Sequence, residues 1–137
     1  MKFRTLHWQA AADGEPAALV LLDQTRLPGE VVDLVCTDVE MVAEAIEMLR
    51  VRGAPAIGVA AAYGVALGAL CALERPGGDF AADVETMIER LARTRPTAVN
   101  LFWALRRMRG VIAGNAQAPP ASMCELLLAE ANRICVE

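Results

Sequence analysis

Short apolar runs bounded by turn residues predict β-strands in the first 36 residues. The runs are Lys2–Gln9, Ala17–Gln24 and Val31–Cys36, with turn signals at Asp13-Gly14 and Pro28-Gly29. Strands that follow one another through short turns pair in antiparallel order. We therefore predict a three-stranded antiparallel meander, although the alternation of apolar and polar residues within the runs is imperfect.

After Cys36 the apolar positions change to the spacing of an α-helix. Val39, Val42, Ile46 and Leu49 form one stripe, which predicts a helix from the capping box Thr37-x-x-Glu40 to about Arg50. The same spacing predicts helices over 55–73, 80–93 and roughly 97–113, and a fifth from the capping box Ser122-x-x-Glu125 through Ile134. The fold class is thus α+β, with a β-meander (1–36) and a bundle of four to five helices (37–137) in one domain.

The stretch from Gly53 to Leu73 contains no charged residue and is long enough to span a bilayer. It is rich in Ala and Gly, however, and these residues give little driving force for membrane insertion. We predict a buried central helix, in which small residues such as Gly64 and Gly68 let neighbouring helices pack closely. A transmembrane helix is the alternative.

Composition narrows the classes of partner. Of the 137 residues, 55% are apolar and 22% charged, which excludes a disordered chain, and the net charge is −4. An acidic chain is poorly suited to nucleic acid or anionic membranes, so we expect neither as a partner. The cluster Arg90–Arg109 is interpreted as a solvated helix face with partners three or four residues away, with an RNA-binding patch as the alternative. The N-terminal residues do not have the pattern of a signal peptide, so we expect a cytoplasmic protein.

The cysteines and the single histidine do not indicate a metal site. Cys36, Cys71, Cys124 and Cys135 lack the common zinc spacings. We expect them to be free, small and buried side chains. His7, in the first predicted strand, is expected to be structural, and no catalytic triad can be assembled around it. We therefore predict no metal site in this chain.

Two segments place an arginine directly before a proline-containing helix start. They are Arg52-Gly53-Ala54-Pro55 and Arg95-Pro96-Thr97. The first amides of a helix have no acceptor within the helix and carry the positive end of its dipole, so they favour phosphate. Proline fits the first helical position, and Gly53 allows a ligand to approach the backbone. The alternative is two ordinary helix starts in an arginine-rich chain.

The two segments also carry a family resemblance. Residues 50–68 read RVRGAPAIGVAAAYGVALG, residues 95–105 read RPTAVNLFWAL, and residues 21–31 read LLDQTRLPGEV. Together with the predicted helix at 38–50, they resemble the methylthioribose-1-phosphate isomerase family of methionine salvage. That family is related to the alpha, beta and delta regulatory subunits of translation initiation factor 2B.

The resemblance implies an aldose–ketose isomerase that acts on a sugar phosphate without metal or organic cofactor. It assigns substrate binding to Arg52, Gly53, Ala54 and Arg95. It places the catalytic Cys and Asp in a C-terminal Rossmann-like domain beyond Glu137, so none of this chain's cysteines inherits a role. The last predicted helix reaches the end without a capping residue or a proline stop. We therefore expect an N-terminal domain that is inactive in isolation and belongs to a homodimeric full-length enzyme.

The sequence is also compatible with a different function and with a different substrate. A helical domain of this kind can serve as a non-catalytic interaction module, as the regulatory subunits of translation initiation factor 2B do. The substrate can also be a sibling sugar phosphate, ribose 1,5-bisphosphate or 5-deoxyribose 1-phosphate, which differ in the substituent at C5.

Overall fold

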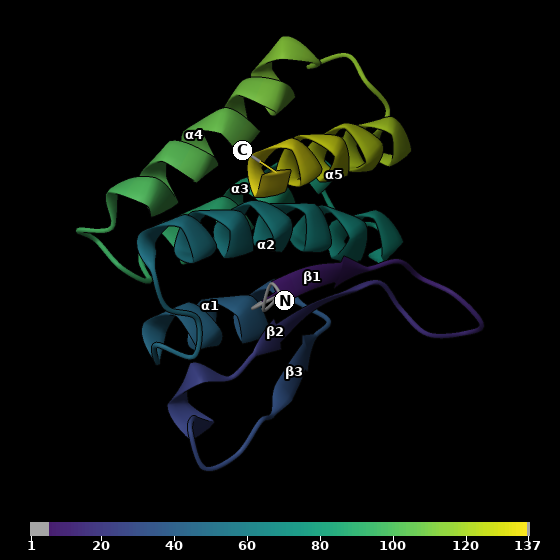
Figure 1. The fold of residues 1–137 in the computed structure, drawn as a ribbon. Helices are drawn as coiled ribbons and strands as arrows, with labels where there is room; N and C mark the ends of the chain where they lie inside the picture. The colour runs from purple at the N-terminus through teal and green to yellow at the C-terminus, as the bar shows by residue number, and fades with distance from the viewer. Residues whose placement is uncertain (1–5, 137) are drawn as a thin grey trace.

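The computed structural model describes residues 6–136, which form a small sheet followed by five helices (Figure 1). Strands β1 (Leu6–Gln9), β2 (Ala18–Leu22) and β3 (Asp33–Cys36) pair antiparallel in the order β1-β2-β3. The predicted meander is confirmed, although residues 2–5 of its first predicted strand lie outside the described residues. The second and third strands are shorter than predicted, and the second is followed by a 3-10 turn (η1, Gln24–Arg26).

The helices are α1 (Val39–Glu47), α2 (Ala54–Glu74), α3 (Phe80–Ala92), α4 (Val99–Gly114) and α5 (Pro120–Val136). They confirm the α+β class and the predicted number of helices. Both predicted capping boxes are wrong. The α1 cap is Asp38, whose side chain accepts a 2.9 Å hydrogen bond from the Met41 amide, and α5 begins before Ser122. Proline at the first position favours the earlier start of α5.

Helix α2 runs through the middle of the molecule, with α4 and α5 on one side and α1 and the sheet on the other (Figure 1). Among residues 6–136, α2 alone is long and apolar enough to cross a membrane, and 72% of its most apolar stretch is buried. The prediction of a buried central helix is therefore confirmed. Its glycines allow close packing, since a Cβ at Gly64 would lie 3.2 Å from both Leu91 and Val42.

Aromatic contacts join the sheet to the helices. The rings of Trp8 on β1 and Tyr63 on α2 stack with centroids 5.5 Å apart. The Tyr63 hydroxyl lies 2.6 Å from the side-chain oxygen of Asn132 on α5, to which it donates a hydrogen bond. These contacts fix the sheet and α5 on α2. His7, one residue before Trp8, is exposed.

The arginine cluster differs from its predicted pairing. Arg90 bonds Glu40 and Glu47 of α1, Arg107 bonds Glu130 of α5, and Arg109 bonds Glu85 of α3. The partners lie on other helices rather than three or four residues away, because these arginines lie beside neighbouring helices rather than facing only solvent. Much of this positive charge is thus neutralised by carboxylates, which weakens the alternative of an RNA-binding patch.

The cysteines are all free, as expected, but only two of the four are buried. Cys36 and Cys124 are buried, Cys71 is half-buried, and Cys135 is exposed on the last turns of α5. The prediction of burial is wrong for Cys135 because it lies on the outer face of its helix, next to the buried Ile134. Among the described residues, no group of three His, Cys, Asp or Glu side chains is placed to hold a metal ion.

Candidate functional site

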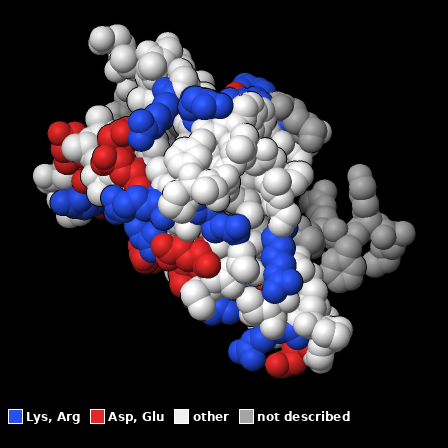
Figure 2. Space-filling view, turned by 90° about the vertical axis from the view of Figure 1, so that its left-hand side faces the viewer, with Lys and Arg blue, Asp and Glu red and all other residues white. Residues whose placement is uncertain are grey.

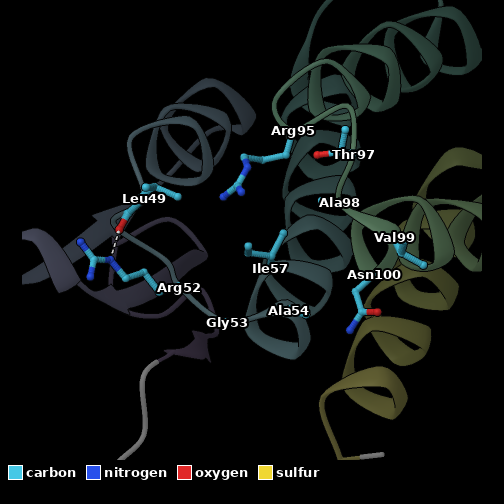
Figure 3. A pocket seen from close by; sticks show the side chains of 10 residues that line it. All are labelled: Leu49, Arg52, Gly53, Ala54, Ile57, Arg95, Thr97, Ala98, Val99 and Asn100. Atoms are coloured by element: carbon cyan, nitrogen blue, oxygen red, sulfur yellow. Dashed lines mark hydrogen bonds between the residues drawn. The ribbon is translucent and has the colours of Figure 1, made fainter.

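The two predicted anion-binding segments meet in one hollow of about 680 Å³ (Figure 3). All four predicted site residues, Arg52, Gly53, Ala54 and Arg95, line it. The remaining lining residues are Leu49, Ile57, Thr97, Ala98, Val99 and Asn100. The hollow therefore lies between the first turns of α2 and α4, beside the connection that leads out of α1.

That connection, residues 48–53, is here called the Arg52 arm. It leaves α1 through a Schellman motif, in which the Arg50 amide bonds the Ala45 carbonyl at 2.9 Å and the Leu49 amide bonds the Ile46 carbonyl at 3.2 Å. Leu49 takes the left-handed position that glycine usually occupies, with φ 58°. The prediction that Leu49 belongs to the core stripe of α1 is therefore wrong. The helix ends at Glu47, and the Leu49 side chain lines the hollow instead.

Arg52 is held within its own arm. Its Nε donates a 3.3 Å hydrogen bond to the Leu49 carbonyl, and the side chain is exposed. Gly53 then caps α2 with φ 93° and ψ 133°, a conformation that side-chain-bearing residues rarely adopt. No side chain caps this end, so the amides of Gly53 and Ala54 remain at the positive end of the α2 dipole. Pro55 follows as the second residue of the helix rather than the first.

Arg95 begins a tight turn, residues 95–98, here called the Arg95 turn. Its carbonyl accepts a 3.0 Å hydrogen bond from the Ala98 amide, and α4 begins only at Val99. The prediction that Pro96 opens the helix is therefore wrong, because Pro96 belongs to this turn and the helix begins only after it. Figure 3 shows the Arg95 side chain extending across the hollow toward Leu49.

The apolar and amide side chains of the hollow were not among the site residues predicted from the sequence. Leu49, Ile57 and Val99 form its apolar lining, and Asn100 adds an amide group. Val99 is 76% exposed, an unusual position for a large apolar side chain at the start of a helix. Ile57 lies two residues after Pro55 and Asn100 lies three residues after Thr97, and this closeness was the one local signal that could have identified them.

The charged groups of the lining are suited to binding an anion rather than to transferring a proton. Its charged groups are the guanidinium groups of Arg52 and Arg95, which form charge-assisted hydrogen bonds with phosphate oxygens. No carboxylate, thiol or imidazole is among the described residues that line it. Figure 2, which views the side of the molecule where α2 and α4 begin, shows basic side chains bordering a largely uncharged surface. In this view the acidic side chains gather mainly to one side of that surface, although the whole chain has a net charge of −4.

Comparison with known families gives one match over most of the chain. Residues 50–137 match the Initiation factor 2 subunit family. The matched region contains both arginine segments and the helices that carry them, so the whole hollow except Leu49 lies inside it.

Curated proteins of similar sequence carry an enzyme name. A protein of Rhodopirellula baltica named methylthioribose-1-phosphate isomerase is 49% identical over 131 residues, which are 95% of this chain and 36% of that protein. A protein of the same name from Geobacter sulfurreducens is 48% identical over 134 residues, 98% of this chain and 37% of that protein. The chain thus spans little more than a third of these relatives.

Two solved structures share the fold. One is 5-methylthioribose 1-phosphate isomerase from Pyrococcus horikoshii, with a TM-score of 0.83 and 36% identity over 96% of this chain and 35% of that one. The other is subunit delta of the translation initiation factor eIF-2B from A. fulgidus, with a TM-score of 0.76 and 36% identity over 97% of this chain and 36% of that one.

Proposed function

This chain belongs to the Initiation factor 2 subunit family, and we propose that it forms the substrate-binding N-terminal part of a methylthioribose-1-phosphate isomerase. The proposed reaction converts 5-methylthioribose 1-phosphate to 5-methylthioribulose 1-phosphate, an aldose–ketose isomerisation of methionine salvage. Its support is the isomerase name of relatives 48% and 49% identical to the chain.

One observation supports assigning phosphate binding, but not proton transfer, to this chain. Arg52 and Arg95 come from separate segments and line one hollow, whose described lining contains no carboxylate, thiol or imidazole. The two guanidinium groups bind the phosphate, and the amides of Gly53 and Ala54 donate further hydrogen bonds to it. Moving hydrogen between two carbons of the sugar requires a general acid and base. We therefore assign proton transfer to groups outside these 137 residues, and we expect the isolated chain to be inactive.

The remaining parts of the proposal concern assembly and location. We propose that the full enzyme is a cytoplasmic homodimer without metal or organic cofactor, with no nucleic acid or membrane among its partners. The net charge of −4 and the pairing of Arg90, Arg107 and Arg109 with carboxylates support the last point.

The test measures isomerase kinetics on the product of the complete reading frame that encodes this chain. Replacing Arg52 or Arg95 with Ala removes a charged contact to the phosphate, so kcat/KM falls about thirtyfold, or about 2 kcal/mol. Arg109→Ala is the matched control, because Arg109 pairs with Glu85 outside the hollow and kcat/KM is expected to stay unchanged. A loss of about twofold or less in Arg52→Ala would contradict the assignment.

A non-catalytic role is the second candidate, favoured by the likeness to subunit delta of eIF-2B from A. fulgidus. In that case the hollow would serve an assembly of subunits rather than a reaction. The product of the complete reading frame would then show no isomerase activity and would copurify with initiation-factor subunits. Isomerase activity in purified protein that lacks such partners would favour the enzymatic role.

The substituent at C5 of the substrate is a separate choice. The apolar side chains of Leu49, Ile57 and Val99 line the same hollow as the arginines, which suits a methylthio group better than a second phosphate. Comparing kcat/KM for 5-methylthioribose 1-phosphate, 5-deoxyribose 1-phosphate and ribose 1,5-bisphosphate decides among the three. The highest value is expected for the methylthio sugar.

A further inference from the structure

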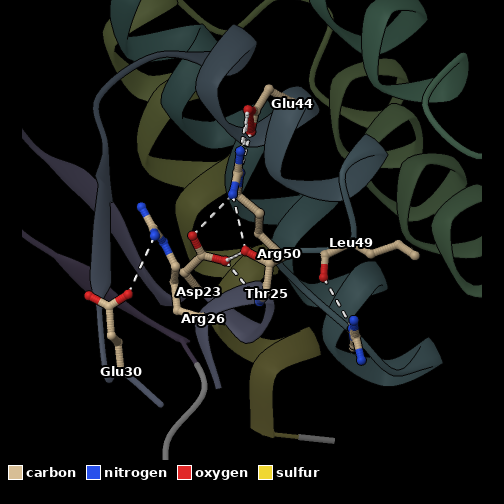
Figure 4. Close-up of polar contacts among 8 residues, drawn as sticks. Asp23, Thr25, Arg26, Glu30, Glu44, Leu49 and Arg50 are labelled. Carbon is tan, nitrogen blue, oxygen red and sulfur yellow. Dashed lines mark hydrogen bonds and ion pairs between the residues drawn. The ribbon is translucent and has the colours of Figure 1, made fainter. Parts of the chain in front are cut away.

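A buried carboxylate lies outside the hollow, at the end of β2. Asp23 is 2% exposed, and its Oδ1 accepts hydrogen bonds from the Thr25 amide at 3.0 Å and the Thr25 hydroxyl at 2.6 Å. Its Oδ2 accepts a 3.1 Å hydrogen bond from Nη1 of Arg50 (Figure 4). Asp23 therefore joins the end of the sheet to the Arg52 arm, across 27 positions in the sequence.

Arg50 is held both by α1 and by η1 with its cap residue Asp23. Its Nε donates to Glu44 of α1 at 2.8 Å, and its carbonyl accepts a 2.9 Å hydrogen bond from the Gln24 amide of η1. Its own amide bonds the Ala45 carbonyl of α1. The segment just before Arg52 thus has both its backbone and its side chain fixed, while Arg52 itself is exposed.

The charge of Asp23 is what makes this attachment strong. Burial raises the pKa of its carboxyl, but the hydrogen bonds from Thr25 and the charge of Arg50 outweigh that effect and hold the pKa below its usual value. Asp23 is therefore ionised at neutral pH. A buried carboxylate needs its partners, because removing one of them leaves an uncompensated charge. Arg50 is consequently confined to one position.

We propose that Asp23 is a positioning residue for anion binding: by holding Arg50 it sets the position from which Arg52 and the first amides of α2 face the hollow. This rests on the proposed function, because the reaction supplies one of its readouts. Asp23 does not line the hollow, and it acts on the ligand only through the Arg52 arm. The Arg95 turn has no part in this attachment, so it serves as a control within the same hollow for effects on the Arg52 arm.

A double-mutant cycle on kcat/KM tests the proposal in the product of the complete reading frame. Asp23→Asn removes the charge and keeps the shape, and we expect about a tenfold loss of kcat/KM. In the background of Arg52→Ala the same change is expected to cost only about twofold, because the arm then keeps only the amides of Gly53 and Ala54 as contacts to the phosphate. In the background of Arg95→Ala it is expected to cost the full tenfold. A merely structural role of Asp23 would give equal losses in both backgrounds and overturn the proposal.

Hydrogen exchange gives a second readout that does not require activity. Asp23→Asn is expected to speed amide exchange about tenfold in residues 49–54 and to leave residues 94–100 unchanged. If the wild-type protein has no isomerase activity, the proposed function fails, and this comparison alone decides on Asp23. Unchanged exchange in 49–54, or equal changes in both segments, overturns the positioning role. If Asp23→Asn does not fold, the same two tests are made with Thr25→Val, which removes a hydroxyl that bonds Asp23.

Discussion

The backbone carbonyl of Asn100 lies directly against α2 at Gly58, where a Cβ would approach its oxygen to 3.0 Å. Any side chain at position 58 would push the start of α4 away from α2. This contact brings the Arg95 turn next to the first turn of α2, where Arg52 and Gly53 lie. The hollow between the two arginine segments therefore depends on the absence of one methyl group.

Replacing Gly58 with Ala is expected to destabilise the fold and to widen the hollow. The neighbouring atom belongs to the backbone, so relief requires moving α4, at a cost of about 1–3 kcal/mol. Better helix propensity returns only about 0.5–1 kcal/mol. Urea unfolding is expected to show a net loss of stability, and kcat/KM of the full enzyme is expected to fall.

Gly110→Ala is the matched control for this prediction. Gly110 lies on α4, and a Cβ there would meet no atom within 4 Å. The substitution is expected to stabilise the protein by about 0.5–1 kcal/mol and to leave kcat/KM unchanged. Equal behaviour of the two variants would show that the contact with Asn100 does not control the approach of α4.

Replacing Gly53 with Ala tests the backbone of the Arg52 arm rather than its packing. A Cβ at Gly53 would meet no atom within 4 Å, but φ is 93°. The whole cost is backbone strain, about 1–3 kcal/mol, and the amides of Gly53 and Ala54 are expected to leave their positions. Urea unfolding measures the strain as a loss of stability, and the affinity for phosphate measures the displacement of the amides. Gly29→Ala, at a glycine without a left-handed φ and with its nearest atom 4.0 Å away, is expected to change neither.

The elements of this fold could be predicted from sequence because their signals are local. The apolar spacing of 80–93 indicated α3 almost to the residue, and Asp13-Gly14 correctly indicated a turn. Helix starts were less certain where two capping residues are adjacent. Thr37 and Asp38 can each cap α1, and the structure uses Asp38 because its carboxylate reaches the Met41 amide.

Only part of the candidate site could be predicted from the sequence. Arg52 and Arg95 were found from their own neighbours, but their meeting in one hollow depends on how closely α4 approaches α2 at Gly58. The attachment of Asp23 to Arg50 also joins residues that are distant in sequence. Local patterns carry no information about either contact, because both arise only when the sheet and the helices pack.

Thiol reactivity is expected to separate the four cysteines of the 137-residue chain. Burial, with the nearby carboxylates of Asp38 and Glu44, raises the pKa of Cys36 to about 11, and burial raises that of Cys124 to about 11. Both thiols stay protonated at pH 8 and are covered by protein, so they are expected to react only after unfolding. Cys135 is exposed and is expected to react first.

Mass spectrometry after brief iodoacetamide treatment measures this order. The folded chain is expected to gain one label quickly, at Cys135, and a slower one at the half-buried Cys71. Cys135→Ser is the control and is expected to abolish the fast label. Rapid labelling of Cys36 or Cys124 in the folded chain would contradict the burial of these side chains.

Acid is expected to weaken the fold through carboxylates that are paired in the folded state. For Asp23, burial raises the pKa, but Thr25 and Arg50 lower it by more, so the folded-state value lies below the ordinary value near 4. The unfolded chain therefore takes up a proton before the folded one does, and stability falls as pH drops below about 4.

At neutral pH Asp23→Asn loses hydrogen bonds to a charged group, which costs about 1.5–3 kcal/mol. That gap is expected to shrink at pH 3, because the wild-type protein begins to lose this contribution as the pH falls below the ordinary pKa of Asp. Urea unfolding of both proteins at pH 7 and pH 3 measures the gap, with Glu30→Gln, in the exposed pair with Arg26, as a control that costs about 0–1 kcal/mol. A gap that stays constant with pH would mean that the charge of Asp23 does not hold the Arg52 arm in place.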